Sequence, residues 1–498
     1  MTSEQLRNLL DSKFNVLCFV DLAEINQSIS AIYKIFHTYH KEEFAANERL
    51  VFYSEHAPSR GLITHIQQAA DLIDISRCYI MICCPNNLNN LFLDNTKFDI
   101  EYYPATVKSN PLLPDSISMS STMCPYPWSN LAIMNRGRIK PCCVSSDVIG
   151  HVTNDKLEDV FNNAFMNNLR NELLEGKKPA GCSHCWDLES HNIESNRQWK
   201  LKYSEKELYA QWLTEPQLRS IDFRPGNVCN FKCRICGPTF SSLIAAEQLS
   251  ATTDLTKTVE LKKINLDSKW FDEDDYFIDQ LTELLPSIEF LDFYGGEPFL
   301  LKQLSKLLKI ATENNDSSHI RLHFATNGSV FPNNLIPYFQ KFKLVDLSIS
   351  IDNIGEKFEF ERGGSWQDVE NNIELLKNET TVNFNIGIAP TVNIQNVLYL
   401  DELFDWADEK GHNVLLNFLD NPKHMNIDFM TDAAKQLVIK KYQNHHRHEL
   451  QKIAHRVMNS SGSDGKAFVQ YMQHLDKLRT QNFVNSHNEI AIAMGYVL

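Results

Sequence analysis

The sequence predicts an α/β protein whose largest part is a partial barrel of six parallel strands. Two observations carry this prediction. Short apolar runs alternate with helical patterns along most of the chain, and polar residues or glycines follow the carboxyl ends of successive runs. Strand–helix repeats form parallel sheets, and polar groups gathered at strand ends mark the active face of a barrel. At 498 residues the chain is too long for one core, so we expect several domains.

The N-terminal segment shows the same alternation on a smaller scale. Apolar runs at 15–21, 49–53 and 79–84 are separated by helical patterns at 28–42 and 62–75. This pattern predicts a small βαβ-type domain with a parallel sheet. No glycine-rich phosphate loop accompanies it, so docking or assembly is the role left open. Proline and serine residues then form a predicted linker that ends near residue 121.

The six barrel strands are predicted in the second half of the chain, at 219–224, 288–293, 320–325, 345–352, 382–388 and 413–418. We expect the first crossover helix at 240–249 and an extended polar insertion at 250–275. The resulting division is a small α/β domain, a cysteine-bearing domain, the barrel and a helical C-terminal extension, at 1–110, 120–200, 215–425 and 426–498.

Three cysteines follow the first barrel strand on one short loop. Cys229, Cys233 and Cys236 have the spacing C-x3-C-x2-C. Thiolates in this arrangement can hold three irons of a cubane cluster and leave the fourth iron without a protein ligand. Structural zinc is the alternative, but such zinc sites close with a fourth ligand nearby, and the next three residues supply none.

The triplet and its position after a strand resemble the radical S-adenosylmethionine (radical SAM) superfamily. In that family the open iron chelates the methionine part of SAM, and reductive cleavage gives a 5′-deoxyadenosyl radical that abstracts hydrogen from a substrate. The resemblance implies a [4Fe-4S] cluster and SAM as cofactors, and an electron donor such as flavodoxin or ferredoxin. Ile235 departs from the family, where an aromatic residue before the third cysteine packs near the adenine.

Residues after the later strands resemble the same family. The second strand ends in Tyr294-Gly-Gly-Glu-Pro298, where two glycines let the backbone approach a ligand and Glu297 supplies a carboxylate for the SAM amino group. We expect Ser350 and Asp352 near the ribose or methionine, and Arg362 on the SAM carboxylate. Taken singly, each motif also has a structural explanation. The cofactor contacts that the resemblance implies are Gly295, Gly296, Glu297, Pro298, Asn327, Ser350, Asp352, Arg362, Thr391 and Ile235.

A second group of cysteines precedes the first. Cys124 and Cys142 flank a predicted hairpin, and a helix at 157–175 is expected to return Cys182 and Cys185 to the same place. The set is similar to the SPASM or twitch auxiliary-cluster module, in the shorter form that holds one [4Fe-4S] cluster, although in most relatives that module follows the barrel. Four thiolates also suit structural zinc. Cys143 is a spare that the sequence does not distinguish from Cys142 as a ligand.

Composition limits the partners. A formal net charge of −15 argues against a nucleic-acid partner, because phosphate binding needs a basic face. No stretch has the length of a membrane span, and the first residues lack a secretory pattern, so we expect a cytoplasmic protein without a membrane partner. In that compartment the 12 cysteines are expected to be ligands and core residues rather than disulfides.

Together these features predict a radical SAM enzyme of the oxidoreductase or peptide-modifying type, in which the auxiliary cluster assists an oxidation. Peptide modification is the first expectation. Dehydrogenation or epimerisation of a sugar-like small molecule is the alternative, and a non-catalytic, zinc-stabilised interaction protein is the third. The sequence assigns no general base and no substrate-binding residue.

Overall fold

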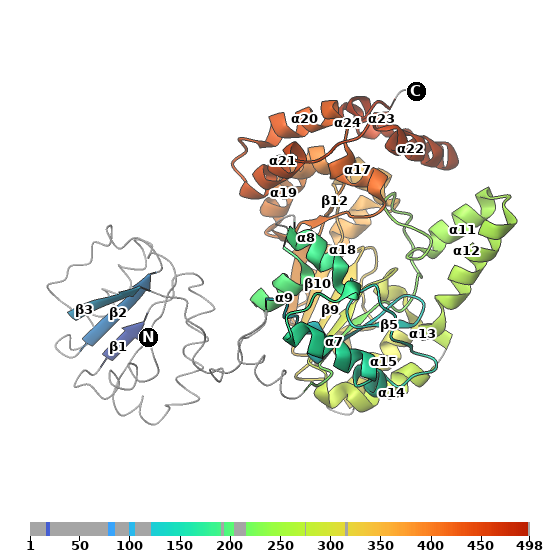
Figure 1. Cartoon of the computed structure of the whole chain (residues 1–498). Helices are drawn as coiled ribbons and strands as arrows, with labels where there is room; N and C mark the ends of the chain where they lie inside the picture. The colour runs from blue at the N-terminus through green and yellow to red at the C-terminus, as the bar shows by residue number, and fades with distance from the viewer. Residues whose placement is uncertain are drawn as a thin grey trace. The chain divides into compact units, whose positions relative to one another are not determined.

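The computed structural model describes residues 16–19, 78–84, 99–104, 121–190, 194–203, 216–273, 275–313 and 317–496. The chain divides into two compact units, Met1–Ser118 and Met119–Leu498. In the first unit, β1 (Val16–Phe19), β2 (Cys78–Cys84) and β3 (Asp99–Pro104) form a parallel sheet (Figure 1). The predicted strands at 15–21 and 79–84 are confirmed, and β3 is an additional strand. The predicted strand at 49–53 and both helices lie outside the described residues.

One mixed sheet runs through the second unit in the order β13-β11-β10-β9-β8-β7-β4-β5-β6. Its strands from β13 to β7 are all parallel and follow the six-strand barrel prediction. The last of them is shorter than expected, because the chain continues as β14 (Asn417–Phe418), which pairs with β12 (Thr391–Val392). The parallel strands are β7 (Ser220–Phe223), β8 (Phe290–Phe293), β9 (Arg321–Thr326), β10 (Leu344–Ile349), β11 (Phe384–Ile388) and β13 (Asn413–Val414).

Helices connect these strands as the α/β prediction requires. They are α11 (Ser242–Ala251), α12 (Leu255–Asp267), α13 (Trp270–Glu273) and α14 (Tyr276–Leu284) before β8; α15 (Lys302–Glu313) and α16 (Ile336–Phe339) before β10; and α17 (Gly355–Arg362), α18 (Trp366–Asn378) and α19 (Leu400–Lys410) before β13. The expected insertion at 250–275 is helical rather than extended, because α12 and α13 occupy it. The side chain of Asp254 caps α12, but only Leu261 and Ile264 of that helix are buried, so it has little apolar periodicity.

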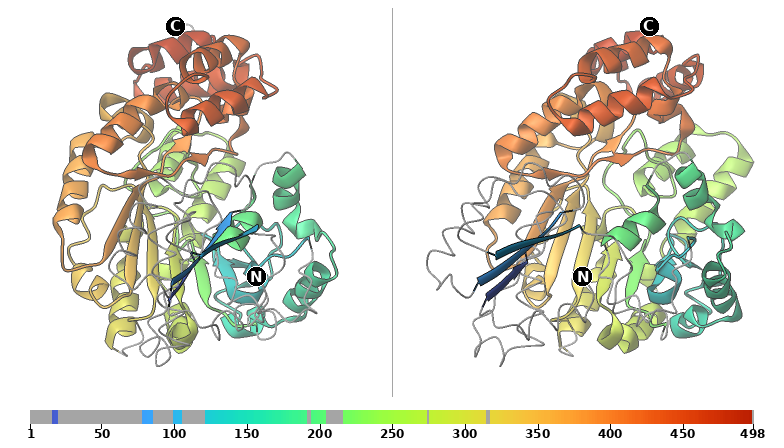
Figure 2. Two further views of the ribbon diagram at one scale, coloured as in Figure 1. Left: turned by 90° about the vertical axis from the view of Figure 1, so that its left-hand side faces the viewer. Right: turned by 60° about the vertical axis from the view of Figure 1, so that its left-hand side comes forward.

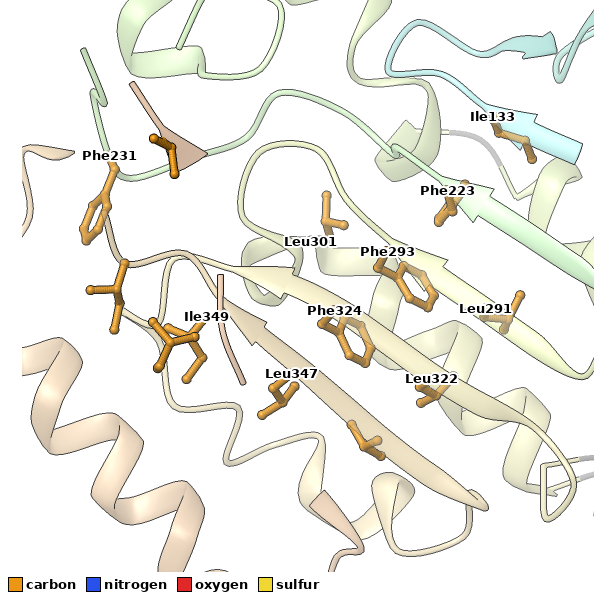
Figure 3. Close-up of a cluster of buried hydrophobic side chains, with 14 of the residues drawn as sticks. Ile133, Phe223, Phe231, Leu291, Phe293, Leu301, Leu322, Phe324, Leu347 and Ile349 are labelled. Atoms are coloured by element: carbon orange, nitrogen blue, oxygen red, sulfur yellow. The ribbon is translucent and has the colours of Figure 1, made fainter. Parts of the chain in front are cut away.

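The outward face of the barrel strands forms the core beneath these helices. Phe223, Phe293, Phe324 and Leu347 are neighbours in strand register, and each is at most 1% exposed. Figure 3 shows them as one layer of side chains along the sheet. Burial of each such side chain contributes about 1.5–3 kcal/mol. Because side chains alternate along a strand, the residues between them point to the barrel interior.

The cysteine-bearing segment extends the same sheet. β4 (Asn130–Ile133) pairs parallel with β7 and antiparallel with β5 (Arg138–Lys140), which confirms the predicted hairpin, and β6 (Gly150–His151) follows. The helix expected at 157–175 is split in two, because Asn163 caps a new helix by accepting from the Met166 N–H. The helices of this segment are α5 (Tyr126–Ser129), α6 (Leu157–Phe161), α7 (Ala164–Leu174), α8 (Ser183–Ser190) and α9 (Asn196–Tyr203).

The C-terminal extension is helical, as predicted. It contains α20 (Asp432–Tyr442), α21 (His448–Met458), α22 (Lys466–Arg479), α23 (Phe483–Ser486) and α24 (Asn488–Ala493). Figure 1 and Figure 2 show these helices grouped beyond one end of the barrel strands. In the part of the chain that the structure describes, no helix combines the length and apolar character needed to cross a membrane.

Candidate functional site

The cysteine triplet lies on the loop between β7 and α11, and the Gly-Gly-Glu loop after β8 packs against it. The Gly296 N–H donates to the Gly226 oxygen at 3.3 Å, and the Glu297 N–H donates to the Val228 oxygen at 2.7 Å. A Cβ atom on Gly296 would lie 2.0 Å from that same Val228 oxygen. Gly295 has a φ of +107°, a conformation that favours glycine. Both glycines of the motif are therefore needed for this backbone contact.

The other side of the cysteine loop is held by the end of α17. The Lys232 N–H donates to the Arg362 oxygen at 3.2 Å, and the Arg234 N–H donates to the Glu361 oxygen at 2.8 Å. The loop is thus fixed between the segments that follow β8 and β10. Two motifs that are far apart in the sequence position the three cysteines.

The three thiols of the loop influence one another. Burial, together with the neighbouring thiols, raises the pKa of Cys229 to about 11 and that of Cys236 to about 12. A metal that binds here must therefore displace protons. The Asn327 amide nitrogen lies 3.9 Å from the Cys229 sulfur, and Arg362 Nη1 lies 3.8 Å from the Cys233 sulfur. Hydrogen bonds of this kind to sulfur tune iron–sulfur sites, so the donors around the loop fit such a cluster.

Glu297 places a buried carboxylate beside the cysteine loop. It accepts hydrogen bonds from the Thr326 hydroxyl at 2.9 Å, the Asn327 N–H at 2.7 Å and the Phe299 N–H at 3.2 Å. Burial raises its pKa to about 7. Among the described residues no basic side chain forms an ion pair with it. A ligand ammonium group would supply the missing positive charge.

Arg362 and Asp352 form a buried ion pair next to the same loop. Arg362 Nε donates to Asp352 Oδ2 at 2.9 Å, and Asp352 Oδ1 accepts from the Thr391 N–H at 2.7 Å. The guanidinium expected on the SAM carboxylate therefore already has a protein partner. Its Nη1 lies 3.8 Å from the Cys233 sulfur, and among the described residues no hydrogen bond from Nη2 is found, which leaves a donor for a second carboxylate.

The other predicted cofactor positions lie around this site. Pro298 is buried and begins a short helical turn directly after Glu297. Ile235 is partly buried against the core. Ser350 follows the end of β10, and its N–H donates to the Thr326 oxygen at 2.8 Å. These positions stay predictions as cofactor contacts.

The second set of cysteines is also gathered in the structure. Burial raises the pKa of Cys124, and Cys142, Cys182 and Cys185 each raise it further. Burial raises the pKa of both Cys142 and Cys143, and the Asp222 carboxylate raises both as well. The Asn196 amide nitrogen lies 3.5 Å from the Cys143 sulfur. Cys142 as the ligand beside Cys124, Cys182 and Cys185 stays a prediction.

Within the described ranges, no three His, Cys, Asp or Glu side chains are placed as a group that could hold a single ion. The ligands of a cubane cluster stand further apart than those of zinc, because each binds a different iron.

The barrel interior carries a row of polar residues that the sequence analysis missed. His323 hydrogen-bonds through Nδ1 to Asp292, and its Nε2 lies 2.8 Å from the Ser348 hydroxyl. The side chains of His323 and Asp292 are 15% and 17% exposed, although their outward neighbours Phe324 and Phe293 are fully buried. These two polar side chains are thus less buried than the apolar side chains on the outward face, and the Asp292 carboxylate orients the imidazole. The available signal was polar residues alternating with apolar ones in β7, β8 and β9.

Two family models match the chain. Residues 223–404 match the radical SAM superfamily, and residues 124–186 match the SPASM iron-sulfur cluster-binding domain. No curated protein matches the chain.

Three solved structures are similar in part. Native anSMEcpe with bound AdoMet is 17% identical, with 50% of this chain and 65% of that chain covered and a TM-score of 0.33. TYW1 with a lysine-pyruvate adduct bound is 16% identical, with 48% and 72% covered and a TM-score of 0.24. Streptococcus suis SuiB bound to precursor peptide SuiA is 15% identical, with 64% and 56% covered and a TM-score of 0.27. The chain thus aligns with less than two thirds of anSMEcpe and of SuiB, at scores too low to carry a functional argument.

Proposed function

Because residues 223–404 match the radical SAM superfamily and residues 124–186 match the SPASM iron–sulfur cluster-binding domain, we propose that this chain is a radical SAM enzyme that cleaves SAM reductively and uses the resulting radical to modify a peptide. A [4Fe-4S] cluster bound by Cys229, Cys233 and Cys236 supplies the electron for this cleavage. The electron donor is a protein such as flavodoxin or ferredoxin, and the reaction takes place in the cytoplasm.

One observation carries the proposal. The buried carboxylate of Glu297, which has no basic partner in the described residues, lies on the loop that packs against the cysteine triplet. An amino acid that chelates an open iron would bring its ammonium group to this carboxylate, and its own carboxylate to the free donors of Arg362. The pairing of these two groups around one cysteine loop supports SAM as the ligand.

The first test is SAM cleavage. Anaerobically reconstituted protein, reduced with dithionite, is incubated with SAM, and 5′-deoxyadenosine is measured by chromatography and mass spectrometry. We expect product from the wild-type chain and none from a variant in which Cys229, Cys233 and Cys236 are all alanine. E297Q should raise the KM for SAM more than it lowers kcat. The proposal fails if wild-type protein with a full complement of iron and sulfide forms no 5′-deoxyadenosine.

Cys124, Cys142, Cys182 and Cys185 would hold an auxiliary [4Fe-4S] cluster, which would supply an acceptor for the electron lost by the substrate radical. That oxidation would also release a proton, and we assign its uptake to the imidazole of His323, which hydrogen-bonds to Asp292. Replacement of the four auxiliary cysteines by alanine should leave SAM cleavage intact and abolish the oxidised product. Substrate turnover that survives this replacement would contradict the role.

The substrate class is tested directly. The protein is incubated with a pool of short randomised peptides and, separately, with a panel of aminated and neutral sugars, and mass spectrometry detects products that have lost two hydrogens. We expect modified peptides. A product only from the sugar panel would replace the peptide proposal with dehydrogenation of a small molecule and leave the SAM chemistry unchanged. A brown colour and bound sulfide in anaerobically purified protein would exclude the zinc-stabilised alternative.

A further inference from the structure

The C-terminal helix α22 contacts the cysteine loop, although it lies beyond both matched family regions. The Tyr471 hydroxyl donates to the Arg234 backbone oxygen at 2.6 Å, and Arg479 Nη1 donates to the Lys232 backbone oxygen at 2.8 Å. Both acceptors lie in the short stretch that carries the three cysteines. The backbone N–H groups of Lys232 and Arg234 are held by α17, so α22 completes the hydrogen bonding of the same two peptide segments.

Arg234, which lies between the second and third cysteines, sends its side chain into the C-terminal helices. Its guanidinium is fully buried, and Nη2 donates to Asp476 Oδ1 at 2.6 Å and to Gln481 Oε1 at 2.8 Å. The other carboxylate oxygen of Asp476 accepts from the Tyr496 hydroxyl at 2.6 Å. Burial of an arginine is unfavourable without such partners, so the loop and the C-terminal helices are expected to order together.

A second ion pair connects α22 to the helix that follows the loop. Arg479 Nη2 lies 2.8 Å from Glu247 Oε2 on α11, and Lys232 Nζ lies 2.8 Å from Glu247 Oε1. The side chains of Arg479 and Glu247 are 9% and 10% exposed. The hydrogen bond from Arg479 Nη1 to the Lys232 oxygen places the guanidinium beside the residue that precedes Cys233.

We propose that α22 is part of the cofactor site, in which Tyr471, Asp476 and Arg479 act as positioning residues for the cysteine loop and Arg479 favours the reduced state of the cluster that the loop holds. This inference rests on the proposed cluster at Cys229, Cys233 and Cys236. A buried positive charge stabilises the more negative, reduced cluster and therefore raises its reduction potential. Residues that support metal ligands from behind typically change affinity or activity on the order of 10–100-fold when they are replaced.

The experiment compares full-length R479Q, R479K and Y471F with a matched control, R456Q. Arg456 forms an ion pair with Asp428 at 2.7 Å in the same helical group and has no contact with the cysteine loop among the described interactions. Four quantities are measured: the melting temperature, the amide hydrogen exchange of peptide 226–238 in metal-free protein, the midpoint potential of the reducing cluster by titration with electron paramagnetic resonance, and the rate of 5′-deoxyadenosine formation.

We expect R479Q to speed exchange in peptide 226–238, to shift the midpoint potential downward and to lower the rate of SAM cleavage on the order of 10-fold. R479K should recover the potential because it keeps the charge, and Y471F should speed exchange without moving the potential. R456Q should lower the melting temperature while exchange and potential stay at wild-type values.

The inference is overturned if R479Q matches R456Q in loop exchange and in midpoint potential, whatever the melting temperatures. It is also overturned if the wild-type triplet holds no cluster. If wild-type protein shows the cluster signal but no 5′-deoxyadenosine, the proposed function fails alone, because exchange and potential still decide the role of α22.

Discussion

Glu297 gives the metal-free protein a pH dependence of stability whose sign and size follow from its surroundings. Burial raises the pKa of this carboxyl from its ordinary 4.5 to about 7. Between these pH values the folded chain keeps a proton that the unfolded chain has released, so the free energy of unfolding falls as the pH rises. At about 1.36 kcal/mol per pKa unit, the difference between 4.5 and about 7 corresponds to about 3 kcal/mol.

The substitution Glu297→Gln isolates this contribution. We expect the free energy of unfolding of metal-free wild-type protein to drop about 3 kcal/mol more than that of E297Q between about pH 4.5 and about pH 8. Urea unfolding followed by circular dichroism at a series of pH values gives both curves. The glutamine also disturbs the bond from the Asn327 N–H, but that cost is the same at every pH and cancels when the slopes are compared.

A matched control uses a carboxyl that the fold does not bury. Glu409 on α19 is exposed, so E409Q should reproduce the wild-type slope. Equal slopes for wild type and E297Q would refute the reasoning, since they would mean that Glu297 ionises as easily in the folded chain as in the unfolded one. The same burial predicts that SAM binding releases a proton below about pH 7, because the ammonium group stabilises the carboxylate.

Three further predictions concern the loops and the thiols. Gly296→Ala places a Cβ atom 2.0 Å from the Val228 oxygen, so the iron bound at the triplet and the melting temperature should both fall. Gly237→Ala should change neither, because a Cβ there meets nothing within 4 Å. Equal iron contents in the two variants would contradict the packing argument. Cys142→Ala should remove one cluster and lower the iron content from about eight irons per chain to about four, while Cys143→Ala should keep both clusters. Iron analysis with the reverse result would exchange the two assignments. Asp352→Ala leaves the Arg362 guanidinium buried without its carboxylate, so the free energy of unfolding measured in urea should fall by about 3–5 kcal/mol. A fall below about 1 kcal/mol would show that water or another group replaces the carboxylate.

The barrel strands could be predicted because their outward faces are strongly apolar. Phe223, Phe293 and Phe324 come from separate runs, and each run is bounded by turn residues or helical patterns. The extended conformation predicted for 250–275 was wrong because the helix there has no apolar face to reveal it. The helix α12 is capped by Asp254 and buries few side chains, so its sequence lacks the helical period.

The candidate site was only partly visible in the sequence. The triplet and the Gly-Gly-Glu motif depend on local spacing, which the sequence displays directly. The contacts of Arg234 with Asp476 and of Lys232 with Arg479 join residues more than 200 positions apart, and no local pattern indicates them. The row from Asp292 through His323 to Ser348 requires the strand register, because each member comes from a different strand.

By itself, the sequence determined which thiols are available, how many parallel strands the barrel has and where their ends carry glycine, carboxylate or amide groups, since these features follow from spacing and side-chain alternation along the chain. The tertiary structure alone decided that Arg362 is paired with Asp352 and that α22 contacts the cysteine loop. These outcomes depend on which surfaces meet in space, and the packing of distant segments is a property of the whole fold that no local stretch of residues encodes.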